Sequence, residues 1–223
     1  MPIRKLLLAA AGGAAPLFAI LARWVLSGDS TPFDLWIRDT VHSWASPFAT
    51  AALYAITMLG MEWVMVALGA LLVWRLAARG YPREAVLLSV GSVGAETASE
   101  LLKLAFHRPR PPVFFGLPPA ISYSFPSGHA FVSTVFYGLL AGILAGAFPL
   151  RRVRILAVWA LAVLAIGFSR VYLGYHYPTD VLGGWLCAAG WLAMAKLWRS
   201  GGAPVNAASE TQEKSDQNPL QDR

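Results

Sequence analysis

Two histidines in the second half of the chain stand at spacings that suit nucleophilic chemistry. His129 closes the segment Pro126-Ser127-Gly128-His129, directly before a long apolar run, and His176 precedes Asp180 by four residues. A carboxylate one helical turn from an imidazole fixes the tautomer and orientation of the ring, as a nucleophile or a base requires. An isolated histidine at a helix end is more often structural, so the neighbouring residues decide between the two interpretations.

Lys103, Arg110 and Arg170 lie at the ends of apolar runs, on the side away from the other basic clusters. A cation within a membrane costs about 3 kcal/mol unless it has a partner. For one such residue, extension toward the lipid headgroups is a sufficient explanation. Several on one face indicate a bound anion, and phosphate fits because guanidinium groups hold its oxygens in pairs while lysine supplies a point charge.

The start of the helix expected after residue 127 adds to this anion site. Ser127 suits an N-cap, and Gly128 lets the backbone N–H groups approach an oxyanion closely. We therefore interpret the set as a phosphoryl-transfer site, in which His176 attacks phosphorus, Asp180 stabilises its charged form and His129 protonates the leaving oxygen. The groups expected to hold the phosphate oxygens are Lys103, Arg110, Arg170, Ser127 and Gly128.

Apolar runs of membrane-spanning length position these residues. The 223-residue chain is 57% hydrophobic and 13% charged, whereas soluble domains carry about 25% charged residues. A transmembrane helix needs roughly 20 apolar residues, and the runs are residues 6–26, 48–74 with a break near Gly60, 85–106, 128–150, 155–171 and 179–197. The sequence predicts an all-α, integral membrane bundle of about six transmembrane helices. We expect one domain over residues 1–199 and a disordered cytoplasmic tail over residues 200–223.

Basic clusters between the runs set the expected orientation. When the spans alternate, these clusters fall on one side: Arg4 with Lys5, residues 75–83, residues 151–154, and Lys196 with Arg199. Positive charge marks the cytoplasmic side, so we expect both termini in the cytoplasm and the histidines on the outer side. The formal net charge is +6, but its division among these clusters argues against nucleic-acid binding.

The remaining segments carry weaker signals. A cleaved secretory signal is the alternative for residues 6–26, although the apolar run is long for that purpose. Residues 27–47 are expected to form an external loop with an interfacial amphipathic piece, anchored by Trp36 and Trp44, in which His42 is solvated. Cys187 lies in an apolar stretch and is interpreted as a packing thiol.

The spaced motifs resemble those of the type 2 phosphatidic acid phosphatases. That family has the pattern K-x6-R-P, then P-S-G-H, then S-R-x5-H-x3-D. The same order is found here, from Lys103 to Arg110-Pro111, from Pro126 to His129, and from Ser169-Arg170 through His176 to Asp180. All three motifs match without departure.

The resemblance implies a helical membrane bundle with an outward-facing site that needs no metal and no cofactor. It also implies a phosphohistidine intermediate on His176, with His129 as the acid. Family substrates include phosphatidic acid, phosphatidylglycerol phosphate and undecaprenyl diphosphate. A small chain with an outward site looks most like the bacterial plasma-membrane enzymes that recycle the polyprenyl carrier, so the expected partner is a lipid phosphate in the bilayer.

Three alternatives stay open at this point. One is a phosphatase for phosphatidic acid or phosphatidylglycerol phosphate. Another is a vanadate-dependent haloperoxidase, whose anion site is closely similar, although the apolar spans argue against a soluble enzyme. The third is a non-catalytic protein that binds or moves a lipid phosphate, for which the cations alone would suffice.

Several residues outside the motifs have two interpretations each. Glu62, Glu96 and Glu100 fall within expected spans. They either have a function, which is to tune Lys103 or to contact a substrate headgroup, or form internal pairs near the membrane boundary. His107 and Arg108 are expected to be peripheral to the phosphate. The loop aromatics are either a lipid-facing lip or ordinary interfacial residues: Phe114, Phe115 and Tyr123.

Overall fold

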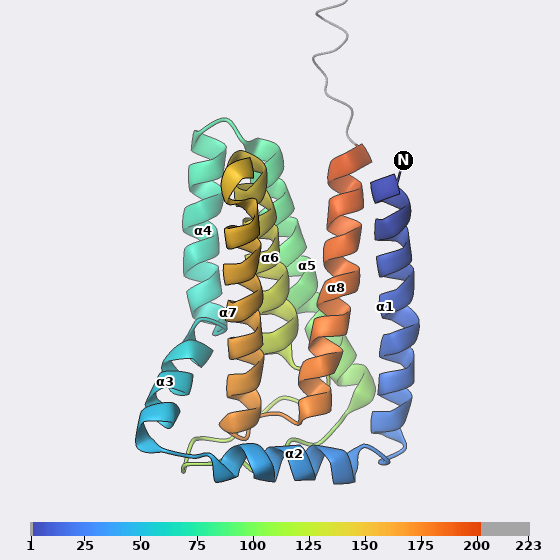
Figure 1. The fold of residues 1–223 in the computed structure, drawn as a ribbon, viewed down its shortest axis with the longest axis vertical. Helices are drawn as coiled ribbons and strands as arrows, with labels where there is room; N and C mark the ends of the chain where they lie inside the picture. Colours follow the sequence, from blue (N-terminus) through green and yellow to red (C-terminus); the bar gives the residue numbers. More distant parts are fainter. Residues whose placement is uncertain (1, 202–223) are drawn as a thin grey trace, which may run out of the picture.

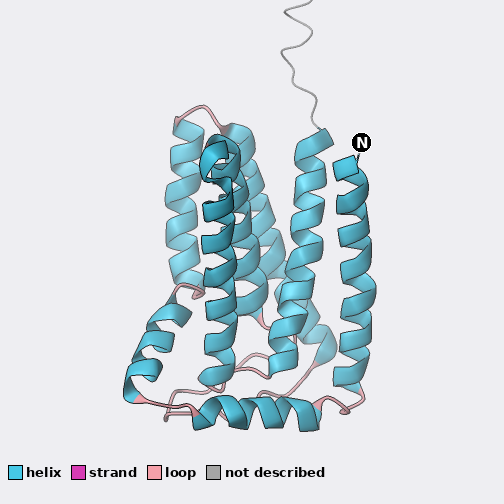
Figure 2. Ribbon diagram, in the orientation of Figure 1, coloured by secondary structure: helices cyan, strands magenta, loops and turns pink. Residues whose placement is uncertain are grey.

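The computed structural model describes the backbone of residues 2–201 and the side chains of residues 12–199. Over that range the chain is helical and contains no strand (Figure 2). The helices are α1 (Pro2–Leu26), α2 (Thr31–Ser43), α3 (Pro47–Met58), α4 (Glu62–Ala78), α5 (Pro82–Phe106), α6 (Gly128–Ala147), the 3-10 turn η1 (Pro149–Arg151), α7 (Arg152–Tyr172) and α8 (Pro178–Gly201). The tail expected after residue 200 and the side chains of Arg4 and Lys5 lie outside the described residues.

The expected all-α membrane bundle is confirmed, and its number of spans can be stated more closely. Within the described residues, α5, α6, α7 together with η1, and α8 are long and apolar enough to cross a membrane. Helices α3 and α4 pass the same test together, bent by 46° at the break expected near Gly60. The described apolar part of α1, Gly12–Leu26, is shorter, so the expected count of six holds only when α1 is included.

The span expected over residues 128–150 ends earlier in the structure. Helix α6 stops at Ala147, and Pro149 begins the 3-10 turn that leads into α7 at Arg152. Proline disfavours helical geometry in the residue before it and has no N–H to donate, so α6 cannot run through this point. The turn therefore separates α6 from α7 near the Arg151 to Arg154 cluster.

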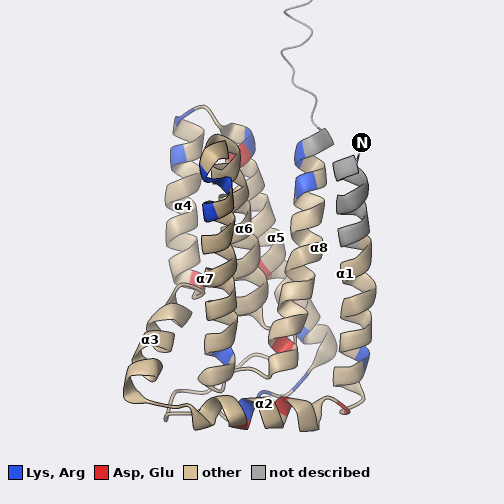
Figure 3. Ribbon diagram, viewed as in Figure 1, with Lys and Arg blue, Asp and Glu red and all other residues tan. Residues whose placement is uncertain are grey.

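The two ends of the bundle differ in what covers them. Helix α2 lies across one end, below the tips of α7 and α8, while α1 runs beside α8 (Figure 1). This is the end at which α5 finishes and at which α6 and α8 begin. At the opposite end, blue basic residues mark α4, α7 and α8 (Figure 3). Basic residues are also present at the α2 end, together with acidic ones (Figure 3), whereas the described clusters used to orient the chain lie at the opposite end.

The first turns of α6 and α8 are packed tightly together. The backbone N–H of Ser127 donates to the carbonyl oxygen of Asp180 at 2.9 Å. Gly184 makes this approach possible, because a Cβ atom there would lie 2.7 Å from the Ser127 carbonyl oxygen. Ser127 and Asp180, which belong to two motifs and are 53 residues apart in the sequence, thus meet at one helix–helix contact.

Candidate active site

A pocket of about 440 Å³ opens at the end of the bundle that α2 crosses. Six of the residues expected to do chemistry line it: Lys103, Arg110, Gly128, His129, Arg170 and His176. They come from α5, the loop after α5, α6, α7 and the connector before α8. Ser127 and Asp180 do not line the pocket and lie behind it. The structure therefore brings the two histidines and the three cations to one cavity.

His176 sits in the connector between α7 and α8 and is 1% exposed. Its Nε2 lies 3.0 Å from Nη1 of Arg110, and its Nδ1 lies 3.3 Å from Oδ2 of Asp180. Because a guanidinium group only donates, Nε2 is the acceptor and carries the lone pair, while the Nδ1–H donates to Asp180. Burial, followed by the charges of Arg110, Arg170 and Lys103, holds the pKa of His176 well below its usual value. The ring is therefore neutral, and the lone pair of its Nε2 faces Arg110.

Asp180 fixes this orientation from the first turn of α8. Its Oδ2 accepts hydrogen bonds from the Ser124 hydroxyl and, at 2.8 Å, from the backbone N–H of Tyr177. Its Oδ1 accepts from Nη1 of Arg108 at 2.5 Å. A carboxylate held by this many donors cannot rotate away from the imidazole, so His176 keeps a single tautomer.

His129 is the second residue of α6 and faces the same pocket. Its Nε2 is buried and has no hydrogen-bond partner among the residues that the structure describes. Its backbone is held from within the helix, where the hydroxyl of Ser133 donates to the His129 carbonyl oxygen. A buried ring nitrogen without a partner is costly, and here it is placed where a group bound in the pocket could satisfy it.

Protein groups hold the two arginines of the pocket in place. Arg110 donates from Nε and Nη2 to the carbonyl and hydroxyl oxygens of Ser122, at 2.6 and 2.9 Å. Arg170 donates to Thr57 at 2.9 Å and lies over the Tyr175 ring, 4.1 Å from its centroid. Within the described part of the chain, no group bonds to the buried Nε of Arg170. Both guanidinium groups are thus oriented before any anion binds, and Arg170 retains a donor for it.

Lys103 completes the cationic side and is held by α5 itself. Its Nζ lies 2.6 Å from Oε1 of Glu100, one turn earlier, so the internal pairing considered for this carboxylate is present. Glu62 and Glu96 also line the pocket, and neither makes a hydrogen bond or an ion pair within the described residues. The pocket therefore holds three carboxylates, those of Glu62, Glu96 and Glu100, as well as the three cations.

The first residues of α6 are shaped by close packing. Ser127 is the N-cap, with its side-chain oxygen accepting from the Ala130 N–H at 3.4 Å. A Cβ atom at Gly128 would lie 2.9 Å from Nζ of Lys103 and 3.2 Å from Oγ of Ser99. Gly128 therefore lets the lysine ammonium reach the start of α6, where free backbone N–H groups also point.

Gly128→Ala is expected to reduce kcat/KM for a lipid phosphate roughly 10- to 100-fold, because the added methyl displaces one charge-assisted contact to phosphate. Gly12→Ala is the control, since nothing lies within 4 Å of a Cβ at that exposed position of α1. Steady-state phosphate release measures both. Unchanged kinetics in Gly128→Ala would remove Lys103 from the phosphate site.

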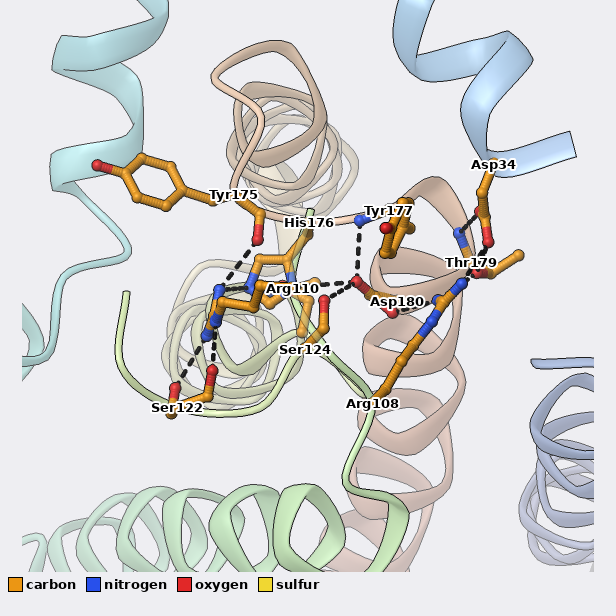
Figure 4. A network of polar contacts seen from close by, with 12 residues as sticks. Asp34, Arg108, Arg110, Ser122, Ser124, Tyr175, His176, Tyr177, Thr179 and Asp180 are labelled. Atoms are coloured by element: carbon orange, nitrogen blue, oxygen red, sulfur yellow. Dashed lines mark hydrogen bonds and ion pairs between the residues drawn. The ribbon is translucent and has the colours of Figure 1, made fainter. Parts of the chain in front are cut away.

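Sequence reasoning missed a buried polar network behind His176. Arg108, expected to be peripheral, does not line the pocket but bridges two carboxylates (Figure 4). Its Nη1 lies 2.5 Å from Asp180 Oδ1, and its Nη2 lies 2.6 Å from Oδ2 of Asp34 on α2. Asp34 in turn accepts from the backbone N–H and the hydroxyl of Thr179, at 3.0 and 2.7 Å. The sequence offered no more than an acidic residue, Asp34, in a segment that was expected to lie at the membrane surface, and this did not indicate a contact with Arg108.

The loop aromatics pack on neighbouring rings, while Phe115 and Tyr123 stay partly exposed at 40% and 37%. His42, expected to be solvated, stacks on Phe114 with 3.7 Å between ring centroids. Phe115 stacks on Tyr172 of α7 at 5.5 Å, and Tyr123 packs edge-on against His107 at 4.6 Å. These contacts hold the loop between α5 and α6 against α2 and α7, because stacked aromatic rings remove a large apolar area from solvent.

The segment that carries the three motifs matches a known protein family. Residues 84–201, more than half of the chain, match the model of the PAP2 superfamily. Undecaprenyl-diphosphatase of Sulfolobus acidocaldarius is 27% identical over 154 residues, which cover 66% of this chain and 68% of the relative. Phosphatidylglycerophosphatase B of Bacillus subtilis is 39% identical over 90 residues, covering 39% and 43%. Lipid A 1-phosphatase of Rhizobium etli is 36% identical over 107 residues, covering 43% and 41%. The last two matches span less than half of those relatives.

Solved structures share the fold. The crystal structure of a transmembrane PAP2-type phosphatidylglycerolphosphate phosphatase from Bacillus subtilis superposes with a TM-score of 0.81 at 24% identity, covering 88% of this chain and 98% of that one. LpxE of Aquifex aeolicus gives a TM-score of 0.59 at 22% identity, covering 74% and 95%. At these identities the likeness concerns the arrangement of helices.

Proposed function

Because the chain belongs to the PAP2 superfamily, we propose that it removes phosphate from a lipid by way of a phosphohistidine on His176. It is a multi-pass membrane protein. One observation carries the proposal: a neutral, oriented imidazole faces a pocket that also holds three cations and a second imidazole. A protein that only bound phosphate would need the cations but no directed lone pair.

The first step forms a nitrogen–phosphorus bond and breaks a phosphorus–oxygen bond. The His176 Nε2 lone pair attacks phosphorus, and the leaving oxygen takes a proton from His129. The charge of the bound phosphate favours the protonated imidazole that this step needs. In the second step, His129 accepts a proton from water, the resulting hydroxyl attacks phosphorus, and phosphate leaves with His176 restored.

The cationic side of the pocket provides electrostatic stabilisation. Arg110, Arg170 and Lys103 face the position of the phosphate oxygens, together with the backbone at Gly128. Their orientation is set before the reaction, so the developing charge is stabilised without rearrangement. The residues present supply this charge themselves, and the proposed reaction needs no metal ion.

We propose a polyprenyl diphosphate as the preferred substrate and the outer leaflet as the place of reaction. The relative that is named undecaprenyl-diphosphatase and aligns over two thirds of its length supports the substrate. Basic residues of α4, α7 and α8 lie at the end of the bundle opposite α2 (Figure 3), and this supports a site on the outer side of a bacterial plasma membrane, with both termini in the cytoplasm. A phosphatidylglycerol phosphate substrate is the second candidate, favoured by the 39% identical segment.

A substrate panel tests this proposal. Purified protein in detergent with excess EDTA is given a polyprenyl diphosphate, phosphatidylglycerol phosphate and phosphatidic acid, and phosphate release is measured. We expect phosphate release to continue in the presence of EDTA and to be fastest from the polyprenyl diphosphate. Faster release from phosphatidylglycerol phosphate would overturn the substrate, and abolition by EDTA would overturn the metal-free mechanism. Halide oxidation on addition of vanadate would instead favour the haloperoxidase alternative.

A further inference from the structure

The network behind His176 contains two carboxylates and one guanidinium group. Arg108 lies between two carboxylates that are both 0% exposed, Asp34 on α2 and Asp180 on α8. Arg108 itself is 11% exposed and lies over the Tyr177 ring, 4.3 Å from its centroid. One guanidinium cannot balance two carboxylates, so the buried triad carries a net charge of −1. Buried charge of this kind persists only with a partner.

His176 is the group placed to be that partner. Its Nδ1–H is directed at Asp180, at 3.3 Å. When Nε2 bonds to phosphorus, the ring keeps its Nδ1 proton and takes on positive charge. If Asp180 were paired only with Arg108, the pair would be neutral and would do little to offset that charge. Asp34 shares Arg108 and so leaves negative charge facing the imidazole.

We propose that Asp34, on the helix that crosses the pocket end of the bundle, and Arg108, in the loop after α5, are positioning residues that set the charge behind His176. The inference depends on the proposed function, because it assigns these residues to the phosphohistidine step. Three further contacts support a fixed arrangement: Asp34 accepts from the Thr179 N–H at 3.0 Å, from the Thr179 hydroxyl at 2.7 Å and from the Ser30 hydroxyl at 3.1 Å. The Thr179 N–H is one of the free donors at the start of α8, so Asp34 also stabilises the helix that carries Asp180.

Apart from Asp180, which lies behind the ring, and Tyr177, which follows it in the chain, the charged and titratable groups around His176 line the pocket, Tyr175 among them. The groups that face the ring or its pocket from the neighbouring elements are Arg110 from the loop, Arg170 from α7, Lys103, Glu96 and Glu100 from α5, His129 from α6, Glu62 from α4 and Asp180 from α8. The cation Arg110 lies against Nε2, whereas the carboxylate of Asp180 is hydrogen-bonded to Nδ1. Charge changes at Asp34 and Arg108 should therefore reach His176 through Asp180.

Opposite charge changes in the triad should move the pH profile in opposite directions. Nucleophilic attack needs neutral His176, so kcat/KM falls as the pH drops through the pKa of His176 in the free enzyme. Asp34→Asn removes a negative charge, disfavours the imidazolium and should move this acid limb about one pH unit lower. Arg108→Gln removes a positive charge, favours the imidazolium and should move the limb about one unit higher. In Asp34→Asn we also expect kcat to fall about tenfold, with KM within about twofold.

Matched variants separate this role from a merely structural one. Asp39→Asn changes a carboxylate on the same helix that is 71% exposed and pairs with Arg38, and it should leave the profile unchanged. Arg108→Lys keeps the charge and should restore the wild-type position of the acid limb. Loss of activity without a shift, or shifts in the same direction, would overturn the proposal. If either Asp34→Asn or Arg108→Gln does not fold, the direction of the shift in the other variant tests the proposal alone. Phosphate release by His176→Ala would instead refute the proposed function.

Discussion

His176→Ala is expected to abolish turnover of every lipid phosphate, with kcat lowered on the order of 10⁴-fold or more, as for other residues that act as the nucleophile. The reason is geometric: among the side chains that line the pocket, His176 alone has a ring nitrogen fixed as an acceptor by an arginine and oriented by a carboxylate. Rapid acid-free quenching with a ³²P-labelled lipid should trap a labelled wild-type protein and leave the variant unlabelled.

The binding properties of the same variant distinguish catalysis from simple recognition. Arg110 and Arg170 keep their protein partners, Ser122 and Thr57, when the imidazole is removed. Inorganic phosphate should therefore still bind to His176→Ala, with a dissociation constant within about tenfold of the wild type, since no charge-assisted contact to the anion is lost. His107→Ala is the control, because His107 packs on Tyr123 outside the pocket. A labelled His176→Ala protein would place the nucleophile elsewhere.

The sequence was informative wherever one element determines the geometry. Apolar length predicted the spans from α5 to α8, and the break near Gly60 separates α3 from α4 as expected. The four-residue step from His176 to Asp180 predicted their contact, since local geometry at the start of α8 brings i and i+4 together. For the pocket, the alternation of spans was sufficient to place its residues at one end of the bundle.

Long-range partners could not be predicted in this way. Asp34 and Arg108 are 74 residues apart, and their contact depends on α2 lying across the bundle end. In the sequence, Asp34 is one of several acidic residues in an amphipathic segment, and nothing distinguishes it from the exposed Asp39. Ser127 illustrates the converse: its type and position suited phosphate binding, but the structure places its hydroxyl at the α6 N-cap and its N–H on Asp180. Which residues of a helix are buried depends on the elements that pack against it, and these elements come from distant parts of the sequence.

His129→Ala is expected to show how strongly the reaction depends on an acid, with kcat for an alkyl lipid phosphate lowered about 10²- to 10⁴-fold. The buried, unpartnered Nε2 of His129 is the donor available in the pocket for the leaving oxygen. An alkoxide leaves poorly without a proton, whereas an aryl oxygen of low pKa can leave as an anion.

The two leaving groups therefore provide an internal control for His129→Ala. Comparing an alkyl phosphate with a nitrophenyl phosphate, we expect the variant to lose less than about tenfold on the aryl compound, because little proton transfer is needed there. His176→Ala, by contrast, should lose activity on both compounds, since phosphorus must be attacked in either case. Equal losses on the two compounds in His129→Ala would show that His129 supports binding or attack rather than departure of the leaving group. The acid and the nucleophile would then have to be reassigned within the same pocket.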